Sequence, residues 1–268
     1  MTQSSTDTLE LRREGGWLFV TLNRPHKRNA MSLAMVNHLS DVFTAIAHDR
    51  TVRAVVLRGA GGHFCAGGDI ADMQRAASET QTDEHDPIAS LNRRFGALLS
   101  QVDRVGAAVV AVCEGAVMGG GFGLACVADV TLAIDGARFR LPETSLGITP
   151  AQIAPFIVRR LGMSQARRLA VTGQTLDAAA AVRLGLAHEL VDPMSVNDAI
   201  EGILGQIRKC EPGAVAETKA IMHRVGTQPL DTILDLAAAD FAKRARSETA
   251  QAGMLARLTR QPAPWAQD

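Results

Sequence analysis

Two glycine-rich turns, each directly after a short apolar strand, constrain this chain most strongly. The first turn lies within His63–Ile70 and follows a strand expected at Ala54–Leu57. The second lies within Glu114–Leu124 and follows a strand expected at Ala107–Cys113. Because glycine has no Cβ, such turns let a ligand approach the main chain closely. Where the turn opens a helix, the free N–H groups and the helix dipole favour developing negative charge.

The order of the expected elements indicates an α/β fold. Leu9–Arg13 and Trp17–Leu22 flank Glu14-Gly15-Gly16 and predict a hairpin. Ser32 predicts the N-cap of a helix that continues to about Asp49. Further elements are expected as a helix over Pro87–Asp103, a buried helix from Gly119 to Ala128 and a strand over Val130–Ile134. Short strands alternating with helices predict stacked ββα units rather than a sandwich or a helical bundle.

The chain divides into three parts. Residues 1–8 are small and polar and are expected to form a disordered tail. Residues 9–192 are expected to form the core with the active site. From Met194 onward the pattern is helical only, with breaks at Pro212 and Pro229, so residues 193–268 form a separate helical region. Within the core, the polar and acidic stretch Ala76–Asp86 is expected to be mobile.

Composition narrows the class of protein. The chain has 268 residues, 47% of them hydrophobic, which suffices for one large core. Its 28 basic and 28 acidic side chains cancel, so no charge pattern favours a nucleic acid or an anionic membrane as partner. The four cysteines are widely spaced without a CxxC pair, which favours free thiols over disulfides or a metal site. With no signal-peptide pattern and no membrane-length apolar run, a cytoplasmic location is expected.

A third stretch, Arg140–Gly147, adds a carboxylate at Glu143. If each glycine turn supplies one N–H to the same oxygen, the two form an oxyanion hole, and a nearby carboxylate can then move protons on the activated substrate. The alternative is that both turns serve only tight packing. A dinucleotide site is disfavoured because the glycine order is Gly-Gly-Gly-x-Gly, and no Gly-Lys-Ser/Thr sequence supports a phosphate loop.

The three stretches together resemble the enoyl-CoA hydratase/isomerase (crotonase) family. Further similarity lies in Leu22-Asn23-Arg24-Pro25, Asn29-Ala30, Leu161-Gly162, Thr172-Gly173 and Ala178–Asp192. The resemblance covers residues 9–192 firmly and the helical tail loosely. It implies a crotonase-like spiral of stacked ββα units with a C-terminal helical oligomerisation region. It also implies an acyl-CoA substrate, no metal, no cofactor beyond the coenzyme A of the substrate, and a homotrimer or a hexamer built as a dimer of trimers.

The resemblance assigns roles to individual residues. The N–H groups of Gly68 and Gly120 match the oxyanion donors, and Glu143 matches one of two family glutamates. The other glutamate falls on Gly123 and is absent. Lys27 and Arg28 are expected near the coenzyme A phosphates. The remaining residues expected to contact substrate are Ala66, Asp69, Ile70, Gly119 and Gly123 itself.

The glycine at position 123 leaves the reaction open. One glutamate suffices for 3,2-enoyl isomerisation, or for hydration if another group orients the water. The candidates for that group are Glu114, Gln152, an ordered water in the space at Gly123, and a carboxylate on the substrate. A non-catalytic acyl-CoA-binding protein is a third possibility, which the intact Gly68, Gly120 and Glu143 disfavour.

A finer similarity predicts the substrate. The segment Leu146–Phe156, together with the Gly-Gly-Gly-x-Gly-Leu sequence, is similar to hydratases of glutaconyl-type thioesters. The terminal Pro264–Gln267 adds to this similarity. The expected reaction is therefore hydration of a branched enoyl thioester, either isohexenylglutaconyl-CoA or methylglutaconyl-CoA. Such substrates carry a second carboxylate, which a site lacking one glutamate repels less.

Overall fold

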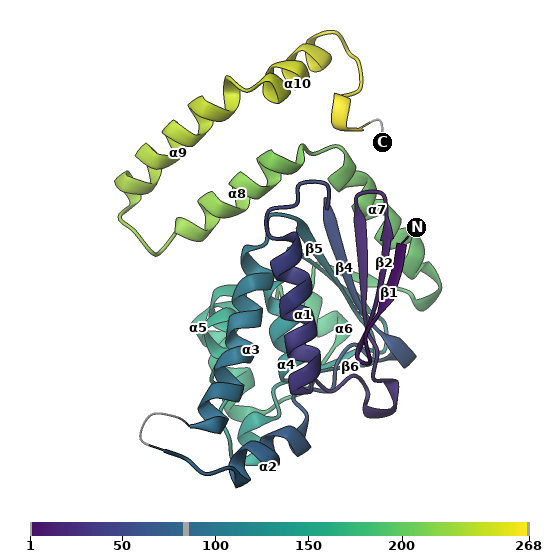
Figure 1. Cartoon of the computed structure of the whole chain (residues 1–268), viewed down its shortest axis with the longest axis vertical. Coiled ribbons are helices and arrows are strands. Elements are labelled where there is room, and N and C mark those ends of the chain that lie inside the picture. The colour runs from purple at the N-terminus through teal and green to yellow at the C-terminus, as the bar shows by residue number, and fades with distance from the viewer. Residues whose placement is uncertain (1, 83–85, 267–268) are drawn as a thin grey trace.

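A seven-stranded sheet forms the centre of the computed structural model, which describes residues 2–82 and 86–266 (Figure 1). The strand order is β1-β2-β3-β4-β5-β7-β10, antiparallel from β1 to β3 and parallel from β3 to β10. These strands are β1 Thr2–Ser5, β2 Leu9–Glu14, β3 Trp17–Leu22, β4 Ala54–Gly59, β5 Ala108–Cys113, β7 Val130–Ile134 and β10 Glu189–Val191. A second, three-stranded sheet contains β6 Ala116–Met118, β8 Arg138–Arg140 and β9 Leu176–Asp177.

Helices cover both faces of the large sheet. The helices of the first 192 residues are α1 Leu33–Ile46, α2 Ile70–Ser78, α3 Pro87–Arg104, α4 Gly120–Val127, α5 Ala154–Thr172 and α6 Ala178–Arg183. Those that follow are α7 Val196–Arg208, α8 Pro212–Arg224, α9 Leu230–Ala245 and α10 Glu248–Leu258. In Figure 1, α1 and α3 lie side by side along the sheet, whereas α9 and α10 lie beyond α8, away from the sheet.

Alternate side chains of β4 and β5 point to opposite faces of the large sheet, and both sets are apolar, so helices cover both faces. Along β4, Val55 and Leu57 join the core that also contains the buried side chains of α1. Their neighbours Ala54 and Val56 join a second core, to which α7 contributes Val196, Ile200 and Leu204. Parallel strands buried on both faces read as continuous apolar runs, as these two strands do in the sequence.

Most elements expected from the sequence are confirmed. Strands β2 and β3 form the predicted hairpin. The Ser32 side chain accepts a hydrogen bond from Met35 N at 3.2 Å and thereby caps α1. The predicted ββα order is seen in β2–β3–α1 and in β5–β6–α4.

Two expectations are wrong. Thr2–Ser5 form β1 rather than a disordered tail, because the backbone of β2 would otherwise be an unpaired sheet edge. Ala76–Ser78, expected to be mobile, are the last turn of α2, where Ala76 is buried. Of the same predicted segment, residues 83–85 lie outside the described residues.

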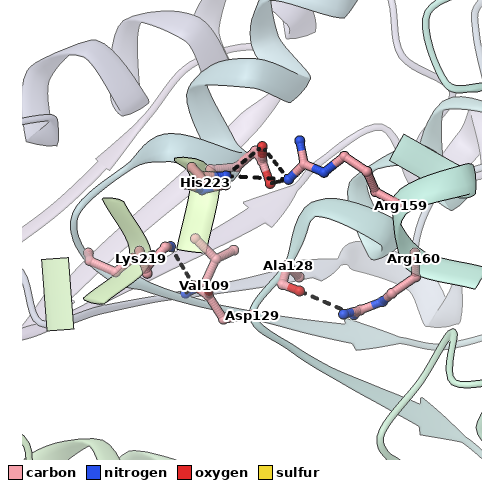
Figure 2. A network of polar contacts seen from close by, with 9 residues as sticks. Val109, Ala128, Asp129, Arg159, Arg160, Lys219 and His223 are labelled. Atoms are coloured by element: carbon pink, nitrogen blue, oxygen red, sulfur yellow. Dashed lines mark hydrogen bonds and ion pairs between the residues drawn. The ribbon is translucent and has the colours of Figure 1, made fainter. Parts of the chain in front are cut away.

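Two side chains of α8, those of Lys219 and His223, attach it to the core (Figure 2). Lys219 Nζ donates to Ala107 O at 3.0 Å and to Asp129 Oδ2 at 2.6 Å, and Asp129 Oδ2 also accepts from Val109 N at 2.7 Å. One turn later on α8, the imidazole Nε2 of His223 contacts the main-chain oxygen of Asp103 at 2.9 Å. Both α8 side chains thus reach the ends of core elements and fix where the C-terminal helices begin.

Replacement of Lys219 by methionine tests this attachment. The side chain of Lys219 is only 11% exposed, so Lys219→Met keeps the packing while leaving Asp129 without its cation. We expect the free energy of unfolding to fall by about 1.5–3 kcal/mol in urea denaturation, as for the loss of a charged hydrogen bond. The matched control Lys209→Met removes an exposed lysine and is expected to have little effect. Equal stability of the two variants would contradict the assignment.

Among the described residues, no helix combines the length and the apolar character that crossing a membrane requires.

Candidate active site

The two glycine-rich loops are joined by a backbone bridge. Cys65 N donates to Ala116 O at 2.9 Å, and Met118 N donates to Cys65 O at 2.8 Å, so Cys65 and Val117 pair as in a parallel sheet. A Cβ on Gly121 would lie 2.7 Å from Cys65 Cβ. Glycine is therefore required where the first turn of α4 approaches the other loop, and the bridge fixes the two loops relative to each other.

The Gly68 N–H points into a cavity. Met31 N donates to Gly67 O at 2.7 Å and Asp69 N donates to Met31 O at 2.9 Å, which makes Met31 and Gly68 a parallel bridge pair. In this pairing the groups of residues 67 and 69 face Met31, so the N–H of Gly68 faces the opposite side. Gly68 lines a cavity of about 590 Å³, and its N–H is free to face a ligand there.

The Gly120 N–H, the second predicted donor, also has no partner in the described part of the chain. Gly120 is the first residue of α4 and lines the same cavity, and the first N–H groups of a helix have no partner within it. The preceding amide, that of Gly119, is already bonded to Arg140 O at 3.0 Å. Within residues 2–82 and 86–266, neither Gly68 N nor Gly120 N donates to a protein acceptor. Both N–H groups thus remain available to a ligand, as the prediction of an oxyanion hole requires.

Glu143 supplies an unpaired carboxylate to this cavity. It opens the 3-10 helix Glu143–Leu146 after β8 and is only 9% exposed. Its Oε2 atom is buried and has no hydrogen-bond partner in the described part of the chain. Burial raises the pKa of this carboxyl, against a smaller lowering by its own backbone N–H. A raised pKa suits a group that must both accept and return a proton.

The other carboxylates that line the cavity are already bonded. Burial alone would raise the pKa of Asp69, but hydrogen bonds from Arg24 and Ala71 N, with the charges of Arg24 and Lys27, lower it. Asp72 accepts from Leu33 N at 2.7 Å, and Asp86 caps α3. Of the carboxylates lining the cavity, only that of Glu143 has a buried oxygen without a partner.

The remaining residues predicted to contact substrate lie around the cavity rather than in its lining. Lys27 and Arg28 are exposed, and the Arg28 carbonyl accepts from Ala66 N at 2.9 Å. Ile70 is 57% exposed at the start of α2. Gly119 caps α4 beside Glu143: a Cβ built on it would lie 2.7 Å from Glu143 Oε1.

Position 123 differs from the expectation. A Cβ on Gly123 would lie 3.2 Å from Leu99 Cδ1 and 3.4 Å from Ile153 Cγ1, so side-chain carbons already cover it. Gly123 is not among the residues that line the cavity, so its expected contact with substrate stays a prediction.

The structure distinguishes the two side chains that the sequence offered for orienting the water, Glu114 and Gln152. Glu114 is bonded to Arg58 at 2.6 Å and does not line the cavity. Gln152 does line it.

The framework around the first loop depends on residues to which the sequence assigned no role. Arg24 Nη2 donates to Asp69 Oδ2 at 2.8 Å, and both side chains are largely buried. Asn29 is fully buried, and its Nδ2 donates to Ala60 O at 2.8 Å and to His63 O at 2.6 Å. In the sequence, only their place in the family-like segments Asn23-Arg24-Pro25 and Asn29-Ala30 pointed to these two residues.

Comparisons with known proteins agree with this geometry. A profile of the enoyl-CoA hydratase/isomerase family matches residues 12–268. An enoyl-CoA hydratase/isomerase from Marinobacter aquaeolei superimposes with a TM-score of 0.95 at 48% identity, over 98% of this chain and 100% of that one. AtuE from Pseudomonas aeruginosa gives 0.94 at 49% identity, over 97% and 100%. A short-chain-enoyl-CoA hydratase from Clostridium acetobutylicum is 33% identical over 252 residues, 92% of each chain.

The chain therefore belongs to the enoyl-CoA hydratase/isomerase family, and the predicted crotonase fold is confirmed. It is an enzyme of this family, and relatives named as hydratases support hydration as its activity.

Replacement of Gly119 by alanine tests the placement of Glu143. Gly119 has a φ of +47°, which an L-residue adopts at a cost of about 1–3 kcal/mol, and the new Cβ would displace the carboxylate. Displacement of a reacting group by about 1 Å can lower activity about 10²-fold. The control is Gly185→Ala, at a φ of +77° with no atom within 4 Å of the new Cβ. Both variants should lose stability, but only Gly119→Ala should lose activity at temperatures where both are folded.

The raised pKa of Glu143 predicts a pH dependence of stability. The folded state holds this proton more tightly than the unfolded state, so stability falls as pH rises from the ordinary glutamate pKa through the raised one. Glu143→Gln removes the buried charge. Relative to wild type, the variant should therefore gain stability between pH 4 and pH 7, measured by urea unfolding at both values. A difference that is independent of pH would contradict the assigned burial.

Proposed function

We propose that the protein is an enoyl-CoA hydratase that adds water across the 2,3 double bond of a branched glutaconyl-type thioester. Isohexenylglutaconyl-CoA and methylglutaconyl-CoA are the candidate substrates. The proposal rests on one observation above all: the unpartnered Oε2 of Glu143 lies in the same cavity as the free N–H groups of Gly68 and Gly120. Coenzyme A enters as part of the substrate, so the reaction needs no separate cofactor.

The two N–H groups stabilise the charge that forms during the reaction. When water attacks C3, electrons move toward the thioester and negative charge collects on its oxygen. Donors fixed in advance by the Cys65–Val117 bridge stabilise this oxyanion without reorganising. Loss of one such donor lowers the rate by about 10²–10³-fold in other enzymes.

Glu143 moves the proton. The oxygen of water bonds to C3 while one of its hydrogens passes to the Glu143 carboxylate. The enolate then collapses, and C2 takes that proton from Glu143. The product is the 3-hydroxyacyl thioester, and Glu143 returns to its ionised form.

The cavity suits a bulky acyl group. Its apolar wall is formed by Met31, Leu33, Val36, Met73, Ile88, Leu91, Phe95, Ile148 and Ile153. A volume of about 590 Å³ falls in the range of small-molecule sites. Two of the lining aspartates are paired with arginines, Asp69 with Arg24 and Asp72 with Arg75, and position 123 adds no carboxylate, so a second carboxylate on the substrate meets less repulsion than in a site with both glutamates.

We also infer how coenzyme A and other subunits are bound. Exposed Lys27 and Arg28 beside the cavity are suited to the phosphates of coenzyme A. Residues 193–268 are proposed to assemble a homotrimer or a hexamer, because α9 exposes Leu234, Leu236 and Phe241. Sedimentation velocity of the purified protein tests this assembly, which a monomer would contradict.

The ultraviolet absorbance of the enoyl thioester tests the function. Loss of absorbance marks hydration, and a gain from a 3-enoyl thioester marks isomerisation. We expect hydration with a higher kcat/KM for methylglutaconyl-CoA than for crotonyl-CoA. An equal or lower value would contradict the glutaconyl-type substrate, and isomerisation without hydration would contradict the hydratase. Binding without any turnover would favour a non-catalytic protein.

Glu143→Gln is expected to lower hydration by about 10²–10⁴-fold, because it keeps the shape of the side chain but removes the base. Binding of the product thioester should persist, as measured by calorimetry. The matched control is Glu114→Gln, which changes a glutamate outside the cavity and should hydrate like wild type. Activity of Glu143→Gln close to that of the control would refute the proposed mechanism.

A further inference from the structure

We propose that the side-chain amide of Gln152 binds the water molecule that attacks C3, in place of the glutamate that position 123 lacks. This inference rests on the proposed hydratase function. It assigns a residue to the attack of water on C3, because Glu143 alone does not orient the water. Glu143 can accept one hydrogen of the water, but a single contact does not direct the water oxygen toward C3.

A glycine inside α3 makes room for Gln152. Gly96 is buried in the middle of the helix, and a Cβ built on it would lie 1.9 Å from Gln152 Oε1 and 2.7 Å from Gln152 Cδ. Glycine in a helix interior is less stable than alanine, so this position carries a residue that disfavours the helix. The compensating feature is the space that the Gln152 side chain occupies.

Helix α3 also relates Gln152 to Gly123. Gly96 and Leu99 are three residues apart on α3 and therefore share a face. Gln152 packs on Gly96, and Leu99 together with Ile153 covers Gly123. Gln152 and Ile153 are consecutive, so the backbone that carries the amide adjoins the residue that covers Gly123.

The amide has a free hydrogen-bonding end. Oε1 is the atom of the amide that lies nearest to Gly96. Gln152 is half-buried, lines the cavity, and makes no side-chain hydrogen bond to any residue that the structure describes. A water whose oxygen accepts from Nε2 can donate one hydrogen to Glu143.

Other neutral polar side chains of the lining are less suited to this role. Gln74 and Thr149 are exposed. Asn92 shares the face of α3 that carries Gly96 and Leu99, but it lies two turns from Leu99, the residue that covers Gly123, whereas Gln152 adjoins Ile153, which also covers it. Because an amide cannot take a proton from water, Glu143 stays the base and Gln152 is a water-binding residue.

Gln152→Met tests the inference, since methionine has a similar length but no amide. Two reactions are measured on each variant. One is hydration of crotonyl-CoA and methylglutaconyl-CoA; the other is exchange of the C2 hydrogens of butyryl-CoA in D2O. The exchange uses Glu143 and the oxyanion donors but no attacking water. We expect kcat for hydration of both substrates to fall about tenfold, KM to stay unchanged, and exchange to stay at the wild-type rate.

Three further variants sharpen the result. Gly96→Ala places a Cβ where the amide lies and should reproduce the Gln152→Met pattern. Gln152→Glu replaces the donating amide by a carboxyl group that donates only when protonated, so hydration should be kept at low pH and fall as this carboxyl ionises. Gln206→Met changes an exposed glutamine on α7 and should behave like wild type.

Unchanged hydration by Gln152→Met would overturn the inference, as would equal loss of hydration and exchange, which marks a structural role. A rise in KM for methylglutaconyl-CoA alone would also overturn it, since the amide would then bind the substrate carboxylate. If the wild-type protein exchanges C2 hydrogens but hydrates no substrate, the proposed function fails instead.

Discussion

The pairing of Cys65 with Val117 holds the two halves of the active site together. Two backbone hydrogen bonds, from Cys65 N and Met118 N, join loops whose sequence positions differ by about fifty residues. On one side of this bridge the chain continues to Gly68, and on the other it continues to Gly120. Each supplies an N–H that has no partner in the described residues. Without the bridge, the two donors would have no fixed separation and could not bind one oxygen together.

The second constraint is the burial of Glu143. A carboxylate without a hydrogen-bond partner is unfavourable in a folded protein, and burial accordingly raises its pKa. The aspartates that line the cavity differ from Glu143, because the carboxylate of each accepts a hydrogen bond from a backbone N–H. The carboxylate of Asp69 is also paired with Arg24. The fold thus satisfies the other carboxylates that line the cavity and leaves unsatisfied the one to which we assign the proton transfer. Unsatisfied buried groups of this kind are typical of functional sites.

Local features of the site and fold could be predicted from the sequence. The glycine turns, the hairpin and the Ser32 cap are properties of a few neighbouring residues, so the pattern sufficed. The family resemblance added the pairing of Glu143 with Gly68 and Gly120, and all three line one cavity.

Features that depend on distant contacts could not be predicted. Leu99 and Ile153 cover Gly123, and Gly96 receives Gln152, yet neither meeting leaves a local pattern. The strand Thr2–Ser5 was missed for a similar reason, because its sequence is polar and its stability comes from the edge of β2. At Gly123 the sequence shows that a carboxylate is missing, but not that the side chains of Leu99 and Ile153 pack against the position.

The central claim is that one carboxylate, Glu143, both takes the proton of water and delivers it to C2. Both transfers then occur on the same face of the double bond. The most direct test is hydration of crotonyl-CoA in D2O, followed by NMR assignment of the relative configuration at C2 and C3 of the product. Syn addition of deuterium and hydroxyl is the predicted result. Anti addition would contradict the account, because the C2 proton would then come from a group on the opposite face.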